Sequence, residues 1–207
     1  MPHRARILVC LCISSLPLAG PAVSAESTGA SRRYRALEHS EAGMGTWAIL
    51  DRDGASRAVD PYLSSLGGGE MGTGVAISPA FTLSVERIDF TVCGHDGPSG
   101  GAGGGQGKNF VALADAATGT PIIKTPAPGS DPLQPRSWDV KEFKGRKVRV
   151  EIHDGIAAGA FAWLGVGKID AGADFKVDFR SGSADGWTNP APSQVKWTEV
   201  RGGVPFR

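Results

Sequence analysis

Residues 87–94 read Arg-Ile-Asp-Phe-Thr-Val-Cys-Gly, and this stretch decides the fold class. Ile88, Phe90 and Val92 alternate with Asp89, Thr91 and Cys93, so one set of side chains is apolar and the other mainly polar. A period of two indicates a half-buried β-strand, because successive side chains in a strand point to opposite faces. We therefore predict a strand here whose apolar face enters the core.

The stretch Lys147–His153 repeats this pattern, with Val148, Val150 and Ile152 on one face and charged residues on the other. Further strands are expected over residues 46–50, 75–83 with an interruption at Pro79, 110–115, 121–125 and 161–169. No segment shows a sustained helical stripe, and glycine and proline separate the strands. Short strands at close spacing favour an all-β sandwich or barrel. We predict a two-sheet antiparallel β-sandwich.

Trp138 opens a short segment, residues 138–145, that is expected to form a structural turn. Asp139 is placed to accept backbone N–H bonds, Phe143 to anchor the turn, and Gly145 to leave it in the left-handed conformation. We expect the Trp138 ring in the core.

The first 25 residues have the features of a secretory signal peptide. Arg4 and Arg6 precede an apolar run, and Val23-Ser24-Ala25 offers small residues for cleavage. An uncleaved anchor is the alternative, but the run is short and broken by proline, which argues against a permanent membrane span. We expect a secreted, periplasmic or cell-surface protein.

The rest of the chain is expected to hold a mobile leader (26–44), one sandwich module (45–172) and a C-terminal extension (173–207). Two strands are expected in the extension, over residues 175–179 and 194–200. The extension either completes the sandwich or begins a further unit.

Charge and cysteine content limit the class of protein. The formal net charge is +1, and loss of Arg4 and Arg6 with the signal peptide changes it to −1. Such balance argues against a nucleic-acid partner, which requires a basic face. Cys93 is the one cysteine outside the signal peptide, so no disulfide framework forms within the chain. We interpret Cys93 as a small packed hydrophobe rather than a nucleophile.

His-Asp-Gly occurs twice, at residues 95–97 and 153–155, each time at the end of a predicted strand. If the two strands run in the same direction, the histidines and carboxylates converge at one end of the sandwich. Such a cluster can bind a metal, whereas two ordinary strand-terminal turns are the simpler interpretation. The glycine-rich stretch 94–109 is interpreted as a surface loop, because it matches neither a phosphate loop nor a dinucleotide motif.

Several segments, taken in order, resemble the galactose-binding-like jelly-roll domain attached to bacterial levanases and related fructan hydrolases. The resemblance covers residues 38–170 and is carried by residues 72–74, 78–81, 88–90, 138–145 and 150–154. Residues 93–97 and 162–167 also resemble a domain of unknown function in large secreted bacterial proteins with cytochrome-c-like segments. The resemblance implies a jelly-roll sandwich of sugar-binding ancestry. The segment 160–163 departs from the levan-binding pattern, which puts fructan specificity in doubt.

These observations favour a non-catalytic module that binds carbohydrate or a cell-envelope glycan. Sugars are held by an aromatic platform and a few polar groups in a concave site. The expected platform is Trp163, and the expected polar rim comprises His95, Asp96, Lys108, Asn109, Asp131 and Asp154. The alternative is a structural domain that holds an envelope protein and has no small ligand. We expect no catalytic residues, because no nucleophile–base pair or acid pair emerges, and no cofactor; the sequence leaves open whether a metal is bound.

Overall fold

The computed structural model describes residues 35–36, 47–53, 57–67, 69–98, 105 and 107–190. The predicted signal peptide, nearly all of the predicted leader and the strand expected over 194–200 lie outside these residues. In the part of the chain that is described, no helix has the length and apolar character needed to cross a bilayer.

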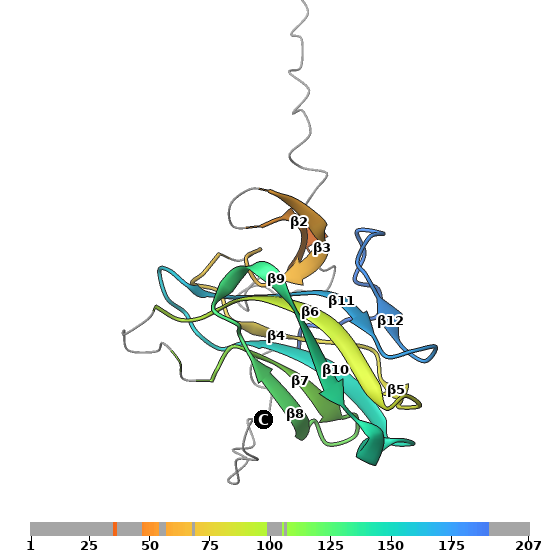
Figure 1. Ribbon diagram of the computed structural model, residues 1–207. Coiled ribbons are helices and arrows are strands. Elements are labelled where there is room, and N and C mark those ends of the chain that lie inside the picture. Colours follow the sequence, from red (N-terminus) through yellow and green to blue (C-terminus); the bar gives the residue numbers. More distant parts are fainter. Residues whose placement is uncertain are drawn as a thin grey trace, which may run out of the picture.

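Two antiparallel sheets stack face to face (Figure 1). Within the described residues, the larger sheet has seven strands in the spatial order β1-β2-β3-β11-β6-β9, with β12 paired to β11. Their bounds are β1 Arg35–Ala36, β2 Ala48–Arg52, β3 Ala58–Ser64, β6 Arg87–Asp96, β9 Ser130–Asp139, β11 Ala162–Asp170 and β12 Lys176–Val177. Each of these strand pairs is antiparallel.

The smaller sheet has five described strands in the order β4-β10-β7-β8, with β5 paired to β10. Their bounds are β4 Gly74–Ile77, β5 Phe81–Thr82, β7 Phe110–Asp115, β8 Pro121–Pro126 and β10 Lys147–Asp154. A single 3-10 turn, η2 at Lys141–Phe143, interrupts the described strands between β9 and β10. The predicted two-sheet antiparallel β-sandwich is confirmed.

The core lies between the sheets and contains both apolar faces that the period of two predicted. The six residues are each at most 4% exposed: Ile88, Phe90, Val92, Val148, Val150 and Ile152. Trp138 is also 4% exposed and packs against Phe90 with 4.5 Å between ring centroids. Its indole Nε1 donates a hydrogen bond to the hydroxyl of Thr125 at 2.8 Å, so the polar atom of this buried ring is satisfied.

The sequence pattern misses strand β3 and, of more importance for the site, strand β9. It contains Pro132 and Pro135, and proline cannot donate a hydrogen bond to a neighbouring strand. The structure tolerates both because β9 lies at the end of the strand order and pairs with β6. Asp131, one of the residues expected at the polar rim, therefore stands on an edge strand.

The described part of the C-terminal extension packs onto the sandwich. Phe175 stacks on Phe81 with 4.7 Å between ring centroids, and Phe179 and Trp187 belong to the same core cluster. Thr188 forms an isolated antiparallel bridge with Ile77 at the edge of β4. The described residues of the extension therefore lie against the core of the sandwich.

Replacing Trp138 by alanine is expected to lower the free energy of unfolding by about 3–5 kcal/mol, because it leaves a cavity beside Phe90. Trp138→Phe keeps most of the ring and loses the bond to Thr125, so its cost is expected to be about 1 kcal/mol. Chemical denaturation measures both. An unchanged midpoint for Trp138→Ala would contradict the core assignment.

Candidate functional site

The side-chain amide of Asn109 connects the two His-Asp-Gly turns. Its Nδ2 donates to the carbonyl of His95 at 2.9 Å, and its Oδ1 accepts from the backbone N–H of Gly155 at 2.8 Å. Asn109 is fully buried. The ends of β6 in the larger sheet and β10 in the smaller sheet therefore lie at the same end of the sandwich, where the sequence placed a shared site.

Asp96 organises the chain as it enters β7. Its carboxylate accepts backbone N–H bonds from Gly107 at 2.6 Å, Lys108 at 3.1 Å and Asn109 at 2.9 Å. Successive N–H groups around one carboxylate form an anion-binding concavity, here filled by the protein's own side chain. The sequence predicted Asp96 as part of a ligand-facing rim; in the structure its oxygens bind the backbone instead.

Asp154 is also turned inward rather than toward a rim. It is 2% exposed, and its nearest polar neighbours are Ser65, Asn109 and the backbone of Ile156. The pKa of Asp154 is raised to about 7: burial is the largest cause and the charge of Asp96 adds to it, and together they outweigh the lowering effect of these hydrogen bonds. The expectation that its carboxylate projects to solvent is wrong.

His95 and Asp131 form a surface pair that bridges β6 and β9. His95 Nε2 lies 2.9 Å from Asp131 Oδ1, and the Asp131 side chain is 47% exposed. The pair therefore exposes about half of the Asp131 side chain and a much smaller part of the His95 side chain to solvent. Lys108 is exposed nearby, and its carbonyl packs closely against Gly155.

Trp163 does not present its ring to a ligand. It is 4% exposed and packs with Tyr62 and Cys93 in a small cluster on the outward face of the larger sheet. The Tyr62 hydroxyl donates to the carbonyl of Arg52 at 2.7 Å and closes one side of the cluster. Burial raises the pKa of the Cys93 thiol far above its ordinary value, which disfavours the reactive thiolate. The prediction that Trp163 forms an aromatic platform for a ligand is therefore wrong.

The aromatic ring that is exposed at this end belongs to Phe161. It is 51% exposed, and its backbone has φ 56°, a left-handed conformation that bulky residues rarely adopt. The Gly97 N–H donates to the Phe161 carbonyl at 2.7 Å, and the ring meets His95 edge-on at 5.0 Å. The sequence pattern missed it because the apolar run 161–169 predicts one buried strand, whereas β11 begins at Ala162.

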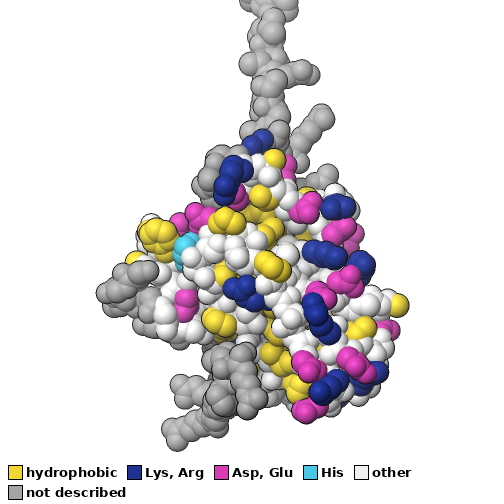
Figure 2. Space-filling model, in the orientation of Figure 1, with side chains coloured by type: hydrophobic (Ala, Val, Ile, Leu, Met, Phe, Trp, Pro, Cys, Tyr) yellow, Lys and Arg dark blue, Asp and Glu magenta, His cyan; other side chains and the backbone are white. Residues whose placement is uncertain are grey.

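A second exposed apolar side chain, Met71, stands in a neighbouring loop. Glu70 accepts hydrogen bonds from the backbone of Ala158 through its carbonyl and from Ala162 through its carboxylate, each at 3.3 Å. Met71 is 66% exposed. Figure 2 shows hydrophobic side chains gathered beside a histidine at the left edge of the molecule, the end to which these loops belong.

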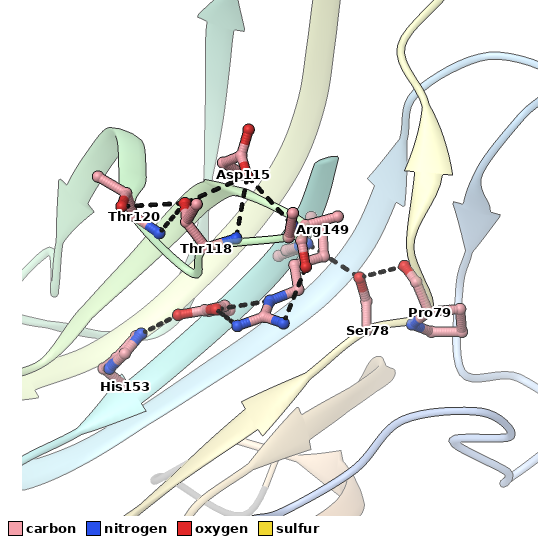
Figure 3. Close-up of polar contacts among 11 residues, drawn as sticks. Ser78, Pro79, Asp115, Thr118, Thr120, Arg149 and His153 are labelled. Carbon is pink, nitrogen blue, oxygen red and sulfur yellow. Dashed lines mark hydrogen bonds and ion pairs between the residues drawn. The ribbon is translucent and has the colours of Figure 1, made fainter. Parts of the chain in front are cut away.

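A separate row of polar side chains runs along the outward face of β10 (Figure 3). Arg149 Nη2 lies 2.6 Å from Glu151 Oε1, and His153 Nε2 lies 2.8 Å from Glu151 Oε2. Burial alone would raise the pKa of Glu151, but its hydrogen bonds and charge interactions with His153 and Arg149 outweigh burial and lower it. His153 also stacks on Phe110 at 4.3 Å. These groups satisfy one another, and we interpret the row as structural.

Metal binding and similarity to known proteins are two further sources of evidence about function. Among the described residues, no group of three or more His, Cys, Asp or Glu is placed to hold a metal ion. No protein-family model, curated protein or solved structure matches this chain. Function therefore has to be inferred from the end of the sandwich that carries Phe161, His95 and Asp131.

Asp154→Asn is expected to remove a pH-dependent loss of stability. The ordinary carboxyl pKa is 3.8 and that of folded Asp154 is about 7, so between these values the unfolded chain releases the proton first. Stability therefore falls as pH rises through this interval, by up to about 4 kcal/mol. The variant should unfold at a higher temperature than the wild type at neutral pH and at nearly the same temperature near pH 4.

Asp139→Asn is the matched control, since this side chain is 70% exposed. Thermal unfolding across the same pH range should show no such difference for it. Equal pH profiles for wild type and Asp154→Asn would contradict the assignment.

Proposed function

We propose that this chain is a secreted, non-catalytic module that binds a glycan at the end of the sandwich carrying Phe161. The observation that carries the proposal is the exposed Phe161 ring beside the His95–Asp131 pair. The resemblance to sugar-binding jelly-roll domains agrees with this function.

The arrangement suits a sugar for physical reasons. A pyranose or furanose ring has an apolar face that packs on an aromatic ring, and hydroxyls that need both donors and acceptors. Phe161 supplies the ring, the Asp131 carboxylate supplies acceptors, and Lys108 supplies a donor. A preformed site of this kind loses little entropy on binding because β6, β9 and β11 are paired strands.

Backbone strain at Phe161 adds to the argument. Strained conformations persist where the surrounding structure enforces them, and they are concentrated at functional sites. Here the hydrogen bond from Gly97 and the ring contact with His95 hold Phe161 in its left-handed conformation. The strained backbone leaves about half of the apolar Phe161 ring exposed to water. An exposed ring adds little to the stability of the fold, so stability alone does not account for the strain.

A protein partner is the second candidate, favoured by one specific observation. Met71 and Phe161 are the exposed large hydrophobic residues of the described chain, and Glu70 brings their loops together. Adjacent exposed apolar side chains are typical of protein interaction sites. An envelope protein would use both side chains, whereas a sugar needs the aromatic ring and the polar pair.

Phe161→Ala should weaken glycan binding about tenfold, because it removes the stacking face. A glycan array identifies a ligand, and calorimetry with that glycan measures the change in affinity. Asp131→Asn should also weaken binding, since it removes the charged acceptor next to His95. Glu142→Ala, on the η2 turn remote from this site, is the control and should leave affinity unchanged.

Met71→Ser separates the two candidates. A glycan-binding site should tolerate this change, whereas an apolar protein interface should lose affinity as strongly as with Phe161→Ala. If the protein binds no glycan on the array, the carbohydrate proposal is contradicted and binding to a protein partner remains as the candidate function.

A further inference from the structure

The segment that carries Phe161 begins directly after the buried carboxyl group of Asp154. We call residues 155–161, between β10 and β11, the Phe161 loop. At its start the Gly155 N–H donates to Asn109 Oδ1 at 2.8 Å, and the Ile156 N–H points back to Asp154 Oδ1 at 3.5 Å. The loop therefore folds back over the Asp154 carboxyl group before it reaches Phe161.

Few interactions hold the Phe161 loop against the sandwich. Its buried side chain is that of Ile156, at 6% exposure, and residues 157–160 are alanine and glycine. The bonds from Ala158 and Ala162 to Glu70 are long, each at 3.3 Å. Segments with few buried apolar contacts open at a lower free energy than the whole fold. The loop can therefore open while both sheets stay intact.

Asp154 lacks the hydrogen bonds that a buried carboxylate needs. It is 2% exposed, and its Oδ2 atom has no hydrogen-bond partner in the part of the chain that the structure describes. The polar side chains beside it are also engaged with the backbone: Ser65 Oγ donates to the Leu164 carbonyl at 3.3 Å, and Asn109 Nδ2 donates to the His95 carbonyl at 2.9 Å. A buried charge that is not paired is strongly disfavoured, whereas the protonated acid is neutral.

The surrounding charges also favour the protonated form of Asp154. The ionisable side chains on the described elements that meet here are His95 and Asp96 of β6, Lys108 before β7, Glu70 before β4 and His153 of β10. Among them, Asp96 acts on Asp154, and a like charge disfavours ionisation. The others are bonded to other groups or extend to solvent. The pKa of Asp154 is accordingly raised to about 7, by burial first and by the charge of Asp96 in addition.

We propose that proton loss from Asp154 opens the Phe161 loop. Opening gives the carboxylate access to water, so the open form takes up the charge that the closed form disfavours. The proton is then a ligand of the closed form and shifts the equilibrium between the two forms. Acid therefore holds the loop and the Phe161 ring in the closed arrangement, and neutral or alkaline solution releases them.

One consequence rests on the proposed glycan function. If the ring of Phe161 binds a sugar, affinity should be highest in acid, because a protein that spends less time in its binding-competent form binds more weakly. Loop opening itself does not depend on a ligand, so it is tested on the chain alone.

Hydrogen–deuterium exchange of the full chain, without ligand, measures loop opening at the amides of Gly155, Ala158 and Ala162, which are hydrogen-bonded in the closed form. A carboxyl group in water has the ordinary pKa of 3.8. The protection factors should therefore fall about tenfold per pH unit between about pH 4 and pH 7 and level off above that. Asp154→Asn, which resembles the neutral acid, should keep high protection over the whole range.

His95→Gln is the control, because His95 is the other titratable side chain that contacts Phe161. Its loop amides should show the same slope with pH as the wild type. The Val150 amide, which donates to Ser78 Oγ in the smaller sheet, should be better protected than the loop at every pH, which separates local opening from unfolding of the whole domain.

Protection of the wild-type loop that does not change with pH, a slope that persists in Asp154→Asn, a slope that disappears in His95→Gln, or equal protection of the loop and Val150 would each overturn the inference. Failure to bind any glycan would contradict the proposed function and leave these exchange results unchanged, so the two failures are distinguishable.

Discussion

One buried amide, that of Asn109, holds the functional end of the sandwich together. It joins the end of β6 in the larger sheet to the turn after β10 in the smaller sheet, through a donor on one side and an acceptor on the other. Asn109 is fully buried and contacts both sheets, so its two bonds fix the distance between the strand ends. The turn carrying Asp96 and the loop leading into β7 are then held by three backbone bonds to one carboxylate.

This construction determines which polar groups remain for a ligand. Buried polar atoms must be paired within the protein, and at this end the amide of Asn109 and the carboxylate of Asp96 are engaged in that way. The groups left at the surface are on the edge strand β9, where Asp131 extends to solvent, and in the loop before β11, where Phe161 is held out. Asn109 and Asp96 thus hold the strand ends in place, whereas Asp131 and Phe161 remain at the surface for a ligand.

The fold followed from the sequence where the period of two was clear, as in Ile88–Val92 and Val148–Ile152, because burial of one face determines that pattern. It was missed in β9, because two prolines hid a strand that only its edge position allows. The convergence of the His-Asp-Gly turns was predicted from their place at strand ends. The sequence did not predict that Phe161, rather than Trp163, is the exposed ring. Both are aromatic residues in one apolar run, and only the left-handed backbone at Phe161 distinguishes them.

Strand β6 supports the candidate site from the middle of the larger sheet. Its outward-facing positions run from Arg87 and Asp89, through Thr91 and Cys93, to His95 beside Phe161. Cys93 is covered by Tyr62 and Trp163, so a packed cluster lies directly next to the site. Strand β6 is paired with β9 on one side and β11 on the other. Asp131 belongs to β9, and Phe161 directly precedes β11, so the three groups of the site come from three neighbouring strands. Their spacing is therefore set by strand pairing, and a ligand that binds there meets a surface already formed before binding.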